Sequence, residues 1–211
     1  RYPTGSDPAR AAAADDHPGV GDGETDALVA LMLLHSARLA SRLPPDGRPL
    51  LLHEQDRSQW DTGQIGLGLR YLDRARRSEV VTSLHLQAAI AAEHATATRA
   101  EDTRWSVILG SYEQLLRVDP SPAALLGHAV ALSRVHGAAA GLEALTRFAE
   151  TRTSDRSPFL HAARADMLSG LGRIGDAVNA YALAIGQARS PAERQLLERR
   201  RDALFISFTA R

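Results

Sequence analysis

The sequence predicts an all-α protein, built as a right-handed solenoid of antiparallel helix hairpins that ends in a capping helix. Ala and Leu make up nearly a third of the 211 residues and aromatic residues only 5%, so helix formers outnumber strand formers. Ser-Pro pairs begin at Ser121, Ser157 and Ser190, and apolar residues between them recur with a helical period. Evenly spaced helix starts of this kind indicate a repeated helical unit.

Each Ser-Pro pair marks a helix start, because Pro at the first helical position lacks an N–H that would be unpaired there in any case. The intervals leave room for helices over 123–135 and 138–150, and then over 159–171 and 176–188. Gly137 and the stretch 172–175 supply the glycines that end helices in the left-handed conformation. Two helices in about 34 residues are typical of the tetratricopeptide repeat (TPR).

Small residues stand where the helices of a TPR-like hairpin approach closely. The best unit has Ala165, Ala177 and Ala184 with Tyr181, and the preceding unit has Ala129, Gly141, Leu145 and Phe148. A degenerate third hairpin is expected over 84–95 and 104–117. The sequence 190–193 (SPAE) predicts a full capping box, followed by a capping helix with an apolar side (Leu196, Leu197, Ala203, Leu204) opposite a polar outer face (Glu198, Arg199, Arg200, Arg201).

Before the repeats, the sequence is less regular. Residues 1–24 are rich in Pro, Gly, Asp and Ala and predict a flexible linker. A helix is expected over 25–43, with Leu28, Leu31, Leu34 (or His35) and Leu39 on its apolar side, ending at the turn 44–47. Residues 49–56 fit either an extended segment or a single turn, and a helix capped by Ser58 should follow over 59–77. The predicted single domain is 25–211, divided into 25–80, hairpins over 81–189 and a capping helix over 190–208.

Composition excludes several classes of function. The 25 basic residues, all Arg, balance 25 acidic residues, which argues against a general nucleic-acid or anionic-membrane surface. The absence of Cys excludes disulfides, zinc ribbons and thiol catalysis. His53-Glu54 lacks the second His of a helical zinc motif. With no long apolar span either, we expect a cytoplasmic protein that is not an enzyme and needs no metal or cofactor.

One segment is not explained by helix packing alone. Residues 53–61 (HEQDRSQWD) hold most of the candidate site residues: Glu54, Gln55, Asp56, Arg57, Trp60 and Asp61, with His35 and Arg38 added from the preceding helix. We favour a structural interpretation, in which Asp56 and Arg57 hold a loop through capping bonds or an ion pair while Trp60 buries its ring. The alternative is a protein contact or ligand pocket on the concave side of the repeats.

Three stretches resemble a known family. They are ALVALMLLHSARLASRLPPDGRPLLLHEQDRSQWD (27–61), LQAAIAAEHATA (86–97) and SPAALLGHAVALSRVHGAAAGLEAL (121–145), and the chain resembles it from 27 to 200. The family is a subgroup of bacterial extracytoplasmic-function (ECF) sigma factors, and the similar region is the TPR-like extension that follows their core domains.

The resemblance implies a non-catalytic regulatory or protein-interaction domain involved in transcription initiation. Its partners would be the sigma core domains, RNA polymerase core, or both. The promoter-binding domains of such factors are not represented in this sequence, so the resemblance implies no direct binding to nucleic acid, and no membrane partner. The alternative function is a small-molecule-sensing helical-repeat domain. A closed apolar pocket with His35, Arg38 or Asp56 in its wall would support that alternative.

Overall fold

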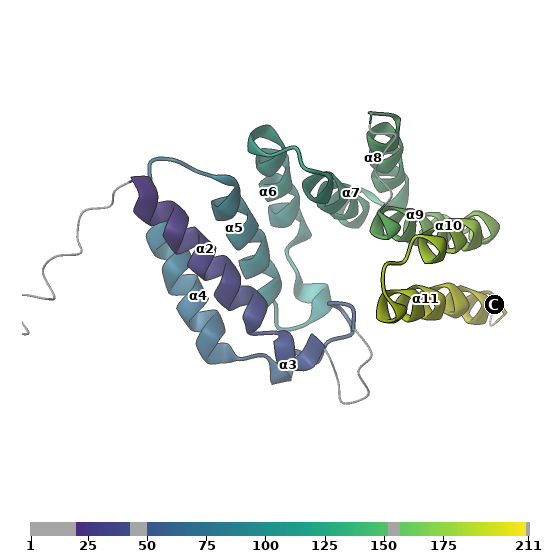
Figure 1. Ribbon diagram of the computed structural model, residues 1–211, viewed down its shortest axis with the longest axis horizontal. Helices are drawn as coiled ribbons and strands as arrows, with labels where there is room; N and C mark the ends of the chain where they lie inside the picture. Colours follow the sequence, from purple (N-terminus) through teal and green to yellow (C-terminus); the bar gives the residue numbers. More distant parts are fainter. Residues whose placement is uncertain (1–19, 43–49, 152–156, 210–211) are drawn as a thin grey trace, which may run out of the picture.

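The computed structural model describes residues 20–42, 50–151 and 157–209, and in these ranges the protein is all-helical, as predicted, with no strand (Figure 1). Two 3-10 turns also occur, η1 (Arg57–Gln59) and η2 (Ala100–Asp102). The α-helices are α2 (Val20–Ser36), α3 (Leu39–Arg42), α4 (Thr62–Ala75), α5 (Ser83–Thr96), α6 (Trp105–Val118), α7 (Pro122–His136), α8 (Ala138–Thr151), α9 (Pro158–Gly170), α10 (Ile174–Gly186) and α11 (Pro191–Thr209).

Helices α2, α4 and α5 pack together at the N-terminal end of the described chain (Figure 1). The buried side of α2 carries Ala27, Ala30 and Leu34 at helical spacing, and Ala37, directly after the helix, is buried as well. These short side chains let α4 and α5 approach α2 closely. The prediction that Leu28 and Leu39 lie on the buried side is wrong, because they are 41% and 58% exposed.

The first predicted helix differs from the structure at both ends. Helix α2 begins at Val20, so residues 20–24 are helical, whereas the rest of the predicted linker, 1–19, lies outside the described residues. The helix ends at Ser36, whose hydroxyl donates to the Leu33 carbonyl and to the side chain of Gln64 in α4. Such hydroxyl bonds compete with the helical backbone pattern. The predicted turn at 44–47 also lies outside the described residues.

The apolar core is distributed along the chain as four clusters of buried residues. The first joins α2, α4 and α5, the second α5, α6 and α7, the third α7, α8 and α9, and the fourth α9, α10 and α11. Successive clusters therefore share α5, then α7, then α9. Each helix from α5 to α10 also packs against the one that follows it.

The residues that the sequence predicted at close helix contacts are buried. Ala165, Ala177, Ala184 and Tyr181 are at most 1% exposed, and Ala129, Gly141, Leu145 and Phe148 are buried as well. The Tyr181 hydroxyl donates to Asp166 of α9. Gly137, between α7 and α8, has φ +90°, a conformation that favours glycine.

The helix caps follow the Ser-Pro prediction in part. The Ser121 hydroxyl accepts from the Ala124 N–H at 3.3 Å and the Ser190 hydroxyl from the Glu193 N–H at 3.2 Å, but the Ser157 side chain makes no cap bond. The predicted capping box at 190–193 is incomplete, because Glu193 accepts from the N–H of Arg189 instead of Ser190.

Helix α11, which the sequence predicts as a capping helix, also differs from its prediction. Leu197 is completely buried, but Ala203, expected on the same apolar side, is exposed. Arg199 and Arg200, expected on a solvated outer face, are half-buried and pair with Glu54 and Asp166. Part of the supposed outer face therefore contacts the rest of the protein.

Candidate functional site

The segment 50–61 is a loop fixed by side-chain caps. The Asp56 carboxylate accepts from the Ser58 N–H at 3.0 Å and from the Ser58 hydroxyl at 2.7 Å, so it caps η1, and these bonds hold the pKa of Asp56 below its ordinary value. The Asp61 carboxylate accepts from the Gln64 N–H at 2.9 Å and caps α4. The prediction of Ser58 as the cap is therefore wrong, and the helix begins at Thr62 because Asp61 is the capping residue.

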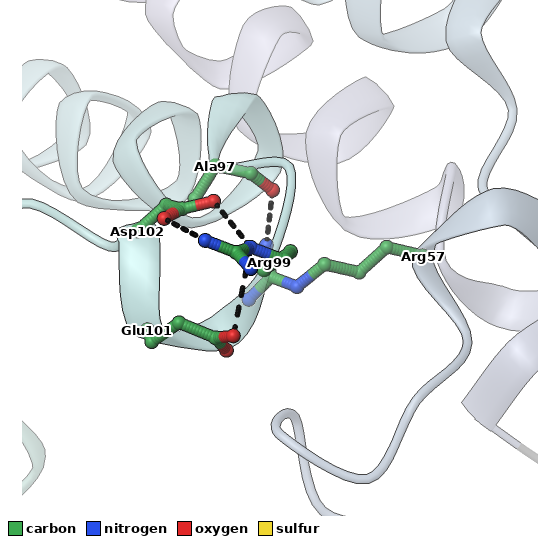
Figure 2. Close-up of polar contacts among 5 residues, drawn as sticks. All are labelled: Arg57, Ala97, Arg99, Glu101 and Asp102. Carbon is green, nitrogen blue, oxygen red and sulfur yellow. Dashed lines mark hydrogen bonds and ion pairs between the residues drawn. The ribbon is translucent and has the colours of Figure 1, made fainter.

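Arg57 connects this loop to the end of α5. Its Nη1 donates to the backbone carbonyl of His94 at 2.6 Å. The same atom donates to the carbonyl of Ala97 at 2.7 Å (Figure 2). These carbonyls belong to the last turn of α5 and the residue after it, where a cation is favoured by the helix dipole. Arg99 is held nearby by its own bond to Asp102, at 3.2 Å (Figure 2). An ion pair between Asp56 and Arg57, one of the two predicted ways of holding the loop, is absent from the described residues.

Trp60 anchors the loop beneath the helices. It is 4% exposed, and the guanidinium carbons of Arg57 and Arg38 lie 4.6 Å and 5.9 Å from its ring centroid, within the range of cation–π attraction. The next residue, Asp61, donates its backbone N–H to the carbonyl of Ala37 at 3.0 Å. These contacts favour the structural interpretation of Trp60.

Glu54 and Gln55 lie in the part of the loop that faces α11. Glu54 accepts from the Leu51 N–H at 2.8 Å and forms an ion pair with Arg199 of α11 at 3.1 Å, across 145 positions of sequence. The Gln55 amide donates to the Leu50 carbonyl at 3.2 Å. The loop thus links the N-terminal helices to the last described helix.

His35 and Arg38 lie together at the end of α2. Their side chains are in contact, with 2.9 Å between Arg38 Nη2 and His35 Nδ1, and both line a cavity of about 290 Å³ between α2, α5, α6 and the beginning of α7. Asp56, the third polar residue considered for such a pocket, does not line this cavity and serves as the cap of η1.

His94 is a site residue that the sequence analysis missed. It lines the same cavity, and its ring meets that of Trp105 edge-on at 5.3 Å. Burial, followed by the charges of Arg38 and Arg57, lowers the pKa of His94 to about 4. No local signal could reveal this, because the groups around His94 come from the end of α2 and the residues after it, from η1 and from α6.

The described residues contain no group of three His, Asp or Glu side chains placed to hold a metal ion. In the same part of the chain, no helix combines the length and apolar character needed to cross a membrane.

A match to a known protein family covers the N-terminal helices and the loop. Residues 11–76 match DUF6596, a family of unknown function. The DUF6596 match includes Arg38 and the whole of segment 50–61, but it ends before α5. An uncharacterized protein of Rhizobium meliloti (strain 1021) is 36% identical over 177 residues, which cover 84% of this chain and 41% of that protein. The chain thus spans less than half the length of this relative. No solved structure matches.

Proposed function

We propose that this chain is a non-catalytic regulatory domain of an ECF-type sigma factor and acts in the cytoplasm by binding other proteins. We further propose that α5–α11 form a TPR-like solenoid closed by α11. The observation that carries the proposal is the set of four clusters that share α5, α7 and α9, since stacked hairpins bury a continuous core through their neighbours. Solenoids of this kind commonly bind other proteins along an extended concave surface.

The comparisons support a domain that works within a larger protein. The Rhizobium meliloti relative is more than twice as long as the region it shares with this chain. The resemblance to sigma-factor extensions described above would account for such additional sequence, because those extensions follow promoter-binding domains. DUF6596, being of unknown function, neither adds to this proposal nor conflicts with it.

The proposed contact surface is a hollow of about 530 Å³ between the loop and the helices. Leu51, His53 and Glu54 line one side, and residues of α7, α9 and α11 line the others. His53 is exposed there. The hollow lies beside Arg134, Asp166 and Arg200, so it offers a partner both charges and apolar surface.

The test is reconstitution with purified partners. The full chain is mixed with RNA polymerase core, and separately with the promoter-binding domains of an ECF sigma factor from the same organism, and each mixture is separated by gel filtration. We expect a stable complex with at least one of them. Migration of the chain alone in both mixtures, at concentrations of about 10 μM, would overturn the proposed function.

A pair of matched variants locates the surface. His53→Asp places a negative charge in the hollow, whereas Met32→Asp places the same charge on α2, where Met32 is 63% exposed and outside the hollow. We expect H53D to weaken the complex by about tenfold or more and M32D to leave it unchanged. The reverse result would place the contact on α2 and refute the assignment to the hollow.

A further inference from the structure

The cavity beside His35 and Arg38 has the composition of a small-molecule site. Its volume, about 290 Å³, is at the lower end of the range for ligand pockets. The wall includes an apolar part (Leu31, Ile90, Leu115) and a polar part (His35, Arg38, His94). A ligand that filled it would therefore touch mostly hydrocarbon and meet polar groups on one side.

The polar part of the wall has a positive charge that no carboxylate offsets. Arg38 is half-buried, and its side chain contacts the His35 ring and the ring of Trp60. No Asp or Glu lines the cavity, and none of the described acidic side chains forms an ion pair with Arg38. A guanidinium removed from water without an anion is destabilising, and a bound anion would relieve that cost.

The two histidines next to Arg38 are neutral near pH 7. Burial, and then the charges of Arg38 and Arg42, lower the pKa of His35. The pKa of His94 is lowered to about 4. His94 Nδ1 is also buried without a hydrogen-bond partner in the structure. The cavity wall therefore combines one guanidinium charge with two neutral imidazoles.

We propose that this cavity binds a small amphipathic anion, a monocarboxylate with an apolar body. A guanidinium pairs with a carboxylate through two parallel hydrogen bonds, and Leu31, Ile90 and Leu115 would surround the hydrocarbon. The single formal charge in the wall matches one carboxylate better than a doubly charged phosphate. This binding site goes beyond the proposed interaction with sigma or polymerase and does not depend on it.

The position of the cavity gives the ligand a structural effect. Arg38 lies between α2 and α3, His94 belongs to α5, and Leu115 and Ala124 belong to α6 and α7. A bound carboxylate would thus join the N-terminal helices to the first helices of the repeats. A ligand that binds only the folded chain raises its melting temperature.

The probe is 4-phenylbutyrate, compared with the uncharged 4-phenylbutanamide and with phenyl phosphate. Calorimetry measures affinity for the full chain, and thermal unfolding measures the shift in Tm. We expect 4-phenylbutyrate to raise Tm by about 3–6 °C at ten times its Kd. The amide should bind at least about tenfold more weakly, because it leaves the guanidinium without an anion.

Three variants assign the effect to the cavity. Arg38→Met removes the charge and keeps an apolar stem, while Ala91→Leu fills part of the cavity and leaves Arg38 in place. We expect both to lose 4-phenylbutyrate binding by about tenfold or more. Arg70→Met, at an exposed position on α4 outside the cavity, is the matched control and should bind within about twofold of the unmodified chain.

Several results would overturn the assignment. Equal affinity for the acid and the amide would show that the charge is not recognised. Tighter binding of phenyl phosphate would show that the class of anion is wrong. If A91L binds 4-phenylbutyrate as tightly as the unmodified chain, the ligand does not occupy this cavity. If the unmodified chain binds no 4-phenylbutyrate up to roughly 10 mM, the cavity is not a binding site for this class of anion.

Discussion

Replacement of Gly141 by Ala tests the packing of α7 against α8, on which the proposed repeat architecture depends. A Cβ atom at Gly141 would lie 2.6 Å from Ser133 Cβ, 2.7 Å from the Ala129 carbonyl oxygen and 3.0 Å from Met167 Cε. One of these atoms is backbone, so relief of the overlap requires α7 and α8 to move apart.

Two opposing contributions decide whether G141A raises or lowers the free energy of unfolding. Ala is favoured over Gly in a helix by up to about 1 kcal/mol, whereas overpacking costs about 1–3 kcal/mol. Since two of the three contacts are shorter than real Cβ contacts ever are, we expect a net loss of about 1–2 kcal/mol. In a chain of this length that loss lowers Tm by about 2–8 °C.

Gly110→Ala is the matched control for this substitution. Gly110 lies inside α6, and a Cβ there would meet nothing within 4 Å, so helix propensity alone should raise stability by up to about 1 kcal/mol. Thermal and urea unfolding, followed by far-UV circular dichroism, measure both variants. If G141A proves as stable as G110A, α7 and α8 do not approach as closely as described, and the reasoning about stacked hairpins fails.

Three other substitutions test the loop and the buried histidine. Trp60→Ala should destabilise the fold by about 3–5 kcal/mol in urea unfolding, because the ring is buried; an unchanged midpoint would contradict its role as an anchor. Below pH 6.5 the unfolded chain protonates His94 but the folded chain does not, so stability should fall by roughly 3 kcal/mol down to pH 4. His94→Gln should remove that part of the pH dependence. If the free energy of unfolding changes with pH in the same way for H94Q and the unmodified chain, His94 is not its source. Glu54→Gln should cost less than about 1 kcal/mol, because its pair with Arg199 is a third exposed; a larger change in the unfolding midpoint would mean that this ion pair is a major stabilising contact.

Helix positions in the second half could be predicted from sequence because their determinants are local. Ser121 and Ser190 cap helices with their own following residues, and Ala177 and Tyr181 lie one helical turn apart on the side that meets α9. Local spacing fixes both features. The glycine between α7 and α8 was predictable for the same reason, since Gly137 alone makes the turn.

The candidate site could be predicted only in part, because its groups meet across long stretches of sequence. Arg57 bonds to carbonyls 37 and 40 positions away, and Glu54 pairs with Arg199 across 145. Sequence identified the loop from its composition but could not supply these partners. The capping error at Ser58 has a different origin: Asp61 fits the same cap preference, and sequence alone does not decide which cap the chain uses.

The division of the apolar core into four clusters determines which contacts a ligand or partner can break without disturbing the others. Each of the four clusters involves three neighbouring helices, so disruption of one junction leaves the apolar contacts of the others in place. The loop acts differently, because Arg57 and Trp60 fix it to the N-terminal helices while Glu54 meets α11 through a partly exposed ion pair. Such a pair contributes at most about 1 kcal/mol, less than a buried apolar side chain at a junction. The ion pair between Glu54 and Arg199 is therefore easier to break than a junction such as the one that buries Leu197, and its loss would open one side of the hollow proposed to receive a partner.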